Sequence, residues 1–135
     1  MHLILILYPM KKVINTHNAP APIGPYSQAV AANGFLFVSG QIPSNPATGE
    51  IVSGDIKTEA KQVMENIKAI LTEAGLNFGN IVKTSIFLTN MGNFAQVNEI
   101  YGTYFSDQFP ARETVQVAAL PKSVNVEISV IAINS

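Results

Sequence analysis

The sequence predicts an α+β fold in which two helices cover one face of a β-sheet. Two stretches carry apolar residues at the helical spacings of three and four, and the other apolar segments are short and rich in β-branched residues. The segments follow one another as two strands, a helix, a strand, a helix and two strands. The chain has 135 residues, 47% of them apolar, which is enough to bury a core, and no linker divides it.

The first two strands are expected to form a hairpin. Residues 27–32 and residues 35–39 are the two predicted strands, and they flank Asn33-Gly34, a pair that tolerates the positive φ angles of a tight turn. A long loop over residues 40–54 follows, with a short strand expected near its end, at residues 50–52.

The clearest helix is predicted over residues 56–74. Asp55 is placed to cap its start, and Gly75 is placed to end it. The apolar positions that predict its buried face are Ile56, Ala60, Val63, Met64, Ile67, Ile70, Leu71 and Ala74.

A strand over residues 80–89 and a second helix are expected next. Asn93 is a plausible cap of this helix, and Gln96 stands where a capping box has its partner. Phe109-Pro110 marks the break after the helix, because proline cannot continue one.

Residues 114–118 and residues 125–134 are predicted as the last two strands. If both helices cover one face of the sheet, the other face is left bare. Charged residues make up only 13% of the chain, about half the usual ~25%. We therefore expect the bare face to meet another copy of the chain.

Composition excludes several kinds of site. The chain has no cysteine, and its two histidines lie near the N-terminus, so we expect no disulfide, no thiolate chemistry and no metal site built from imidazoles. A net charge of −1 without a basic patch argues against nucleic-acid binding.

Residues 1–9 need separate treatment. They read MHLILILYP, which lacks the charged start and cleavage site of a signal peptide and is far shorter than the ~20 residues that span a membrane. Met10 resembles a natural start. The segment is therefore either an upstream extension that is not native or an additional strand, and residues 10–135 are expected to form the domain of a cytoplasmic protein without membrane contact.

Two charged residues are the best candidates for chemistry. Glu127 interrupts an apolar strand: it either faces solvent or faces a cleft, where burial would raise its pKa toward that of a general acid or base. Arg112 is expected to share a face with Thr114 and Gln116, and it either pairs with Glu113 or Asp107 at the surface or binds a carboxylate with its planar fork.

Sequence spacing does not pair these two residues. If the last two strands formed a hairpin, Glu127 would lie opposite Gln116, more than ~10 Å along the strand from Arg112. Other candidates are weaker: Ser39-Gly40 lies at a strand end without a histidine to activate the hydroxyl, and Tyr26 follows a rigid turn.

Short motifs run through the chain from about Met10 to its end. They are Asn18-Ala19-Pro20, Gly24-Pro25-Tyr26-Ser27-Gln28, Ser39-Gly40-Gln41-Ile42-Pro43, Gly49-Glu50, Asn66-Ile67, Ala74-Gly75-Leu76, Val82-Lys83, Val97-Asn98, Phe109-Pro110-Ala111-Arg112, Leu120-Pro121-Lys122 and Glu127. Together and in this order they resemble the Rid (YjgF/YER057c/UK114) family, and within it the RidA-type 2-iminobutanoate/2-iminopropanoate deaminases. The resemblance implies a chorismate-mutase-like mixed sheet with two helices on one face, and a homotrimer with a central β-barrel and clefts between subunits.

The resemblance also implies an activity. RidA-type enzymes hydrolyse imine and enamine acids, such as 2-aminoacrylate and 2-iminobutyrate, to 2-keto acids and ammonia, without metal or cofactor. Carried over by position, Arg112 would bind the substrate carboxylate and Glu127 would activate water or move a proton. The cleft would be lined by Tyr26, Ser39, Gly40 and Asn98.

Two other readings stay open. The same clefts would also suit a non-catalytic regulator that binds a keto acid or an amino acid. A ribonuclease is poorly supported, because the chain has no basic groove and no spare histidine. Thr114 stands where many relatives carry cysteine or a small apolar residue, which bears on specificity.

Overall fold

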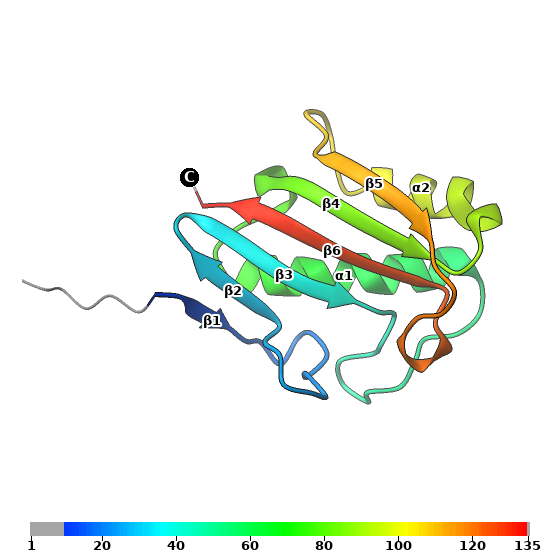
Figure 1. Ribbon diagram of the computed structural model, residues 1–135, viewed down its shortest axis with the longest axis horizontal. Coiled ribbons are helices and arrows are strands. Elements are labelled where there is room, and N and C mark those ends of the chain that lie inside the picture. Colours follow the sequence, from blue (N-terminus) through cyan, green and yellow to red (C-terminus); the bar gives the residue numbers. More distant parts are fainter. Residues whose placement is uncertain (1–9, 135) are drawn as a thin grey trace, which may run out of the picture.

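The computed structural model describes residues 10–134. The strands are β1 (Lys12–Ile14), β2 (Ala29–Ala32), β3 (Phe35–Gln41), β4 (Ile81–Leu88), β5 (Ala111–Gln116) and β6 (Val126–Ile133), and the helices are α1 (Ile56–Glu73) and α2 (Phe94–Gly102). The six strands form one sheet in the order β1-β2-β3-β6-β4-β5. Among these strands of residues 10–134, β4 and β5 pair in parallel and the other neighbours pair antiparallel. Both helices lie behind the sheet in Figure 1, so the predicted mixed sheet with two helices on one face is confirmed.

The strand β1 was not predicted. It is only three residues long, too short for an alternation of apolar and polar residues to show in the sequence, and it pairs antiparallel with β2 at one edge of the sheet. The expectation of an extra strand in residues 1–9 lies outside the described residues.

The predicted hairpin of β2 and β3 is confirmed. Asn33 (φ 51°) and Gly34 (φ 80°) both take left-handed conformations, and Ala32 pairs with Phe35 across the turn. Farther along β3 the pairing with β6 shifts between Val38 and Gln41, so three steps on β3 match two on β6. This bulge falls at Ser39 and Gly40.

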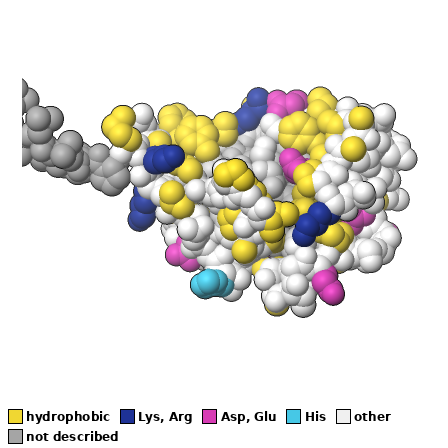
Figure 2. Space-filling view, turned by 60° about the horizontal axis from the view of Figure 1, so that its bottom comes forward, with side chains coloured by type: hydrophobic (Ala, Val, Ile, Leu, Met, Phe, Trp, Pro, Cys, Tyr) yellow, Lys and Arg dark blue, Asp and Glu magenta, His cyan; other side chains and the backbone are white. Residues whose placement is uncertain are grey.

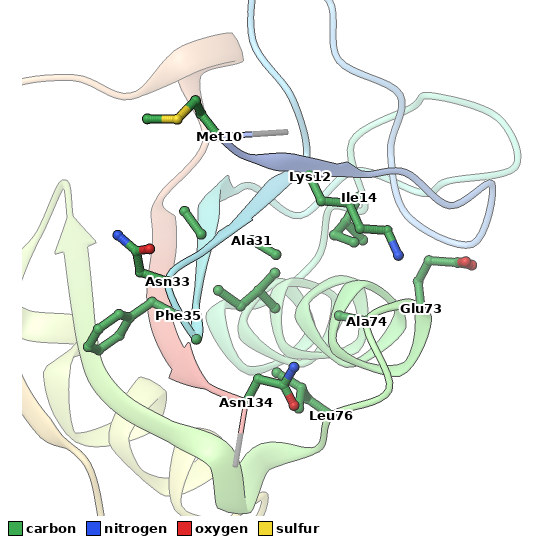
Figure 3. A pocket seen from close by; sticks show the side chains of 13 residues that line it. Met10, Lys12, Ile14, Ala31, Asn33, Phe35, Glu73, Ala74, Leu76 and Asn134 are labelled. Carbon is green, nitrogen blue, oxygen red and sulfur yellow. The ribbon is translucent and has the colours of Figure 1, made fainter. Parts of the chain in front are cut away.

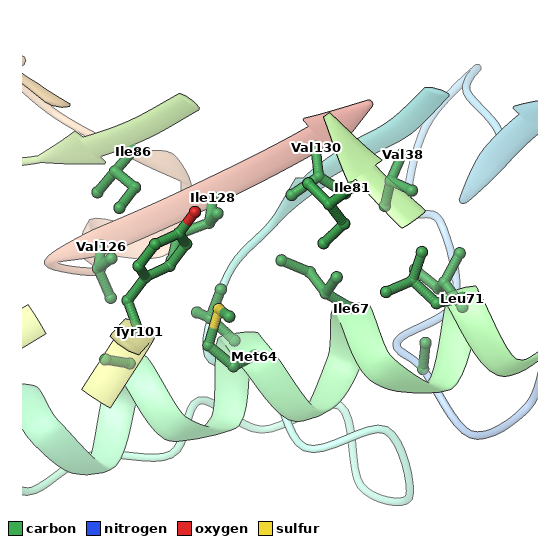
Figure 4. Close-up of a cluster of buried hydrophobic side chains, with 14 of the residues drawn as sticks. Val38, Met64, Ile67, Leu71, Ile81, Ile86, Tyr101, Val126, Ile128 and Val130 are labelled. Atoms are coloured by element: carbon green, nitrogen blue, oxygen red, sulfur yellow. The ribbon is translucent and has the colours of Figure 1, made fainter. Parts of the chain in front are cut away.

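The helix α1 begins and ends as its sequence predicts. The Asp55 side chain accepts a hydrogen bond from the Thr58 amide (2.8 Å), and Gly75 takes a positive φ of 77° directly after the helix. Its apolar stripe packs on the sheet, where Met64, Ile67 and Leu71 face side chains of β3, β4 and β6 (Figure 4). Burial of this stripe fixes the helix to one face of the sheet.

The cap predicted for α2 is wrong. Asn93 makes no capping hydrogen bond, because it is already in a helical conformation (φ −87°, ψ 0°) rather than the extended one that a cap requires. It ends a short 3₁₀ turn, Met91–Asn93, and this turn is capped instead by Asn90, whose side chain accepts from the Gly92 amide (2.8 Å). The capping box with Gln96 is therefore absent.

The last two strands are not neighbours. β5 starts at Ala111, three residues before the predicted position 114, and β4 lies between β5 and β6. The hairpin geometry considered for Arg112 and Glu127 therefore does not apply.

The face of the sheet away from the helices carries exposed aromatic residues. Phe35 and Phe37 on β3 are 43% and 45% exposed, with ring centroids 6.1 Å apart. The side of the molecule that Figure 2 brings forward, which is the bottom of Figure 1, shows hydrophobic and uncharged polar side chains with a few charged groups between them. Among the described residues, no helix is both long enough and apolar enough to cross a membrane.

Candidate active site

Glu127 lies on the bare face of the sheet. It stands on β6 between the buried side chains of Val126 and Ile128, which point to the helices, and it pairs in register with Phe87 on β4. Its side chain is half-buried, and this burial raises the pKa of its carboxyl group above 4.5. Of the two readings of Glu127, an ordinary solvated carboxylate fits the structure less well.

The Glu127 carboxylate rests against the bulge of β3. A Cβ atom added to Gly40 would lie 2.8 Å from the Glu127 Cδ and closer still to Oε2. Glycine is therefore needed at position 40 so that the carboxylate can lie directly on the backbone. Beside it, the Ser39 hydroxyl donates to the Ser27 carbonyl (2.6 Å), so its proton is engaged within the fold.

Tyr26 borders the same small cavity as Gly40, the glycine against which the Glu127 carboxylate rests. Its amide donates to the Gly24 carbonyl (2.8 Å), and its side chain is 51% exposed. Tyr26, Gly40 and Lys122 line a small cavity of about 40 Å³ at the end of the sheet. The fold thus brings together four of the predicted site residues: Tyr26, Ser39, Gly40 and Glu127.

Arg112 occupies a different place. It projects from the edge strand β5 to the helix side, where its Nη1 donates to the Asn98 Oδ1 of α2 (2.7 Å). Its guanidinium carbon lies 5.0 Å from the centre of the Tyr101 ring and 5.7 Å from that of Phe94. The predicted residues Arg112 and Asn98 are therefore in contact, and three side chains of α2 hold the guanidinium.

A surface pair between Arg112 and Glu113 is not formed. Glu113 points to the opposite face, pairs with Lys83 (2.8 Å) and accepts from Ser85. These donors lower the pKa of Glu113. Arg112 itself borders an open cavity of about 480 Å³, together with Asn98, Tyr101, Gly102, Phe109 and Pro110.

Phe94 and Tyr101 were not among the predicted site residues. Both lie on α2 at helical spacing from Asn98, and this spacing of four and three places all three side chains on one face, which was the available signal. Tyr101 is buried, its hydroxyl donates to Thr84 Oγ1 (2.9 Å), and burial raises its pKa. The tyrosine thus forms a fixed platform under the guanidinium.

One chain does not bring Arg112 and Glu127 together. Arg112 pairs in register with Thr84, and Glu127 with Phe87. The two residues are three positions apart along the strands and two strands apart across the sheet, which separates their Cα atoms by about 14 Å. Their side chains also point to opposite faces, so a site using both must combine two chains.

A further cavity lies away from the predicted site residues. A cavity of about 320 Å³ lies between β1, the β2–β3 hairpin and the end of α1, lined by Lys12, Asn33, Glu73 and Asn134 (Figure 3). It is at the opposite end of β3 and β6 from Gly40 and Glu127. The described residues contain no cluster of three or more His, Asp or Glu side chains that would hold a metal ion.

Comparison with known proteins gives the family. The family model described as Endoribonuclease L-PSP matches residues 16–134. The chain belongs to this family, the Rid (YjgF) family. A RutC family protein of Pyrococcus horikoshii is 55% identical over 91% of this chain and 98% of its own.

Other Rid-family relatives carry names that state a function or a ligand. The human 2-iminobutanoate/2-iminopropanoate deaminase is 48% identical over 92% of this chain and 90% of its own. The crystal structure of E. coli TdcF with bound serine superimposes with a TM-score of 0.88 at 46% identity, covering 92% of this chain and 99% of that one. The fold described above is thus the Rid-family fold.

Proposed function

We propose that the protein hydrolyses reactive imine and enamine acids, among them 2-iminobutyrate and 2-aminoacrylate, to 2-keto acids and ammonia. The observation that carries this proposal is the half-buried carboxylate of Glu127, lying on the Gly40 backbone with a raised pKa. A carboxyl group whose pKa is raised by burial is better suited to accept and donate protons in catalysis than a solvated one.

The reaction needs little more than such a group. The carbon of a protonated imine is already electrophilic, so water can attack it without a nucleophilic side chain. Glu127 would take a proton from the attacking water and deliver it to the nitrogen. The C–N bond then breaks as the hydroxyl group of the resulting intermediate loses its remaining proton and becomes the C=O group. The products are the 2-keto acid and ammonia, which takes up that proton as ammonium. Positioning and one acid/base group contribute roughly 10²–10⁴-fold in such a step.

Arg112 would bind the substrate carboxylate. Its contact with Asn98 uses Nη1 alone, so guanidinium N–H groups remain for a carboxylate, and the Tyr101 and Phe94 rings hold the plane of the group. In this proposal Asn98 positions Arg112, whereas Tyr26, Ser39 and Gly40 line the Glu127 side of the cleft.

The two halves of this site would meet between subunits. Arg112 and Glu127 lie on opposite faces of one sheet, and the bare face carries exposed Phe35 and Phe37. A homotrimer whose sheets face one another, with a cleft at each interface, would bury these rings and bring one subunit's Arg112 to the next subunit's Glu127. The name of the human relative supports the deaminase activity.

A binding role without turnover is the second candidate. The relative TdcF has been crystallised with serine, an amino acid whose carboxylate would suit Arg112. Such a regulator would bind amino or keto acids and leave 2-iminobutyrate unchanged.

The test is ammonia release from freshly generated 2-iminobutyrate by the wild type and by the Arg112→Ala and Glu127→Ala variants. Each variant should lose at least ~100-fold in kcat/KM. Lys61→Ala, which removes an exposed cation from α1, is the matched control and should keep full activity. A fully active Arg112→Ala protein would contradict the proposal, and ligand binding without ammonia release by the wild type would favour the regulator.

A further inference from the structure

Glu59 is a buried carboxylate that the proposed chemistry does not use. It lies near the start of α1 and is only 5% exposed. Both of its oxygens accept hydrogen bonds from the same residue: the Asn125 amide donates to Oε1 (3.2 Å), and the Asn125 side-chain Nδ2 donates to Oε2 (2.7 Å). Burial of a carboxylate is costly unless it is hydrogen-bonded, so this two-point contact stabilises a group that packing alone would exclude.

Asn125 connects three elements at the place where β6 begins. Besides its two bonds to Glu59 on α1, its carbonyl accepts from the Thr89 amide (3.2 Å) and its Oδ1 accepts from the Thr89 hydroxyl (3.3 Å), just after the end of β4. All four polar atoms of Asn125 are therefore engaged. The start of β6 is fixed to α1 and to β4 at one point.

This point lies two residues before Glu127, at a place where β6 is paired regularly on one side only. On the β4 side, Val126 and Glu127 stay in register with Leu88 and Phe87. On the β3 side, the pairing skips from Val38–Val130 to Gln41–Ile128 because of the bulge. Side chains alternate along a strand, so a slip of one residue would turn Glu127 to the helix face.

We propose that Glu59, acting through Asn125, is a positioning residue that fixes the start of β6 and thereby holds Glu127 against Gly40. The inference rests on the function proposed above, because it assigns Glu59 a part in that reaction. It places no substrate contact on Glu59, which lies on the helix side of the sheet.

The chemistry of the contact explains why a carboxylate is present. Glutamine at position 59 would keep the shape of the side chain but offer only one acceptor oxygen, and its NH₂ group would face an Asn125 donor. Negative charge is also favourable in the first turns of a helix, which offsets part of the cost of burial. Glu59→Gln is therefore a conservative change that breaks half of the contact.

The experiment measures kcat and KM for freshly generated 2-iminobutyrate in the wild type, Glu59→Gln and Asn125→Ala. We expect kcat to fall roughly 10- to 100-fold in both variants, with KM within about twofold of the wild type because Arg112 is untouched. Lys57→Gln is the matched control: it breaks the exposed Lys57–Glu99 pair (2.7 Å) in the same turn of α1 and should leave kcat unchanged. Wild-type kcat in either Glu59→Gln or Asn125→Ala would overturn the proposal, as would an equal loss in Lys57→Gln.

A second readout does not depend on turnover. The titration of the Glu127 carboxyl, followed by ¹³C NMR, should shift to lower pH in Glu59→Gln, because a loosened β6 start exposes this carboxyl to water. The groups that face Glu127 are Gly40 on β3 and Phe87 on β4; Lys83 and Glu113 share its face, Lys122 lies in the preceding turn, and none of these changes. An unchanged titration would overturn the positioning role. If the wild type releases no ammonia, the proposed function fails, while the titration still decides on Glu59.

Discussion

The half-buried position of Glu127 disfavours the charged form of its carboxyl group, and this affects the stability of the fold. Burial raises the pKa of its carboxyl above the ordinary value of 4.5, so the native protein binds this proton more tightly than the unfolded chain does. Protonation of Glu127 therefore stabilises the fold. This stabilisation is complete below about pH 4.5 and is lost as the pH rises through the raised native pKa.

Glu127→Gln should accordingly be more stable than the wild type at pH 7, although it should be inactive. The uncharged amide keeps the shape of the side chain and avoids the cost of burying a charge. The gain should shrink as the pH falls to about 4, where the wild-type carboxyl is protonated. Urea denaturation at both pH values measures the difference, with the exposed Glu50→Gln as a control that should show none. A Glu127→Gln protein that is less stable than the wild type at neutral pH would contradict the burial of this charge.

Thr114 carries another group that the fold leaves unsatisfied. Its Oγ1 is buried without a hydrogen-bond partner among the described residues. Thr114→Val replaces the hydroxyl by a methyl group of similar size, so we expect the free energy of unfolding to rise by about 1 kcal/mol. Thr114→Ser, which keeps the hydroxyl and removes the methyl, should lower it. Thermal denaturation of the two variants tests this, and a loss of stability in Thr114→Val would mean that the hydroxyl is bonded.

At the scale of elements, the bulge in β3 matters for the candidate site because its Gly40 lies against the Glu127 carboxylate. Gly40 is not in a left-handed conformation, so alanine fits its backbone, and the clash of a new Cβ is with the flexible end of the Glu127 side chain. We therefore expect Gly40→Ala to change the free energy of unfolding by less than about 1 kcal/mol. Ammonia release should nevertheless fall by roughly 100-fold, because the carboxylate is displaced.

The same clash can be measured without activity. In a Glu127→Ala background the carboxylate that the new methyl group would meet is gone, so adding Gly40→Ala should cost less stability than it does in the wild type. Denaturation of the two single variants and the double variant gives this coupling. Equal costs in both backgrounds would show that the glycine is needed for another reason.

The elements that could be predicted from the sequence are those with a periodic apolar pattern over many residues or with a specific turn sequence. The stripe and caps of α1 and the Asn33-Gly34 hairpin are local signals, and the structure confirms them. The three residues of β1 are too few for an alternation of apolar and polar side chains to be recognised. The predicted cap of α2 is wrong because a 3₁₀ turn precedes the helix, and no sequence pattern predicted this turn.

The candidate site could be predicted only in part, for a similar reason. Alternation placed Arg112 on one face of its strand with Gln116, and Gln116 indeed bonds to the Met91 amide on the helix side (2.7 Å). How far Glu127 lies from Arg112 depends on the strand order. No local pattern reveals that β4 lies between β5 and β6 and pairs in parallel with β5. The separation of the two residues therefore becomes visible only in the folded chain.

At the scale of the whole molecule, the bare face and the divided site point to the same assembly. Phe35 and Phe37 are exposed on the face that carries Glu127, whereas Arg112 stands on the outermost strand, β5. A copy whose β5 edge approached the bare face of its neighbour would cover apolar surface and complete the proposed site in one step. In such an assembly each site takes Arg112 from one subunit and Glu127 from another.

This division predicts that two inactive variants restore activity together. When Arg112→Ala and Glu127→Ala subunits are mixed equally, unfolded and reassembled, about one site in four should receive both an intact Arg112 and an intact Glu127. The mixture should therefore recover about a quarter of wild-type ammonia release, whereas each variant reassembled alone stays inactive. An equal mixture of the double variant with wild type is the control: about one site in four should again be intact if two subunits share each site, but about one in two if a single chain supplies both residues. No recovery in the mixture would mean that both residues serve the site from the same chain.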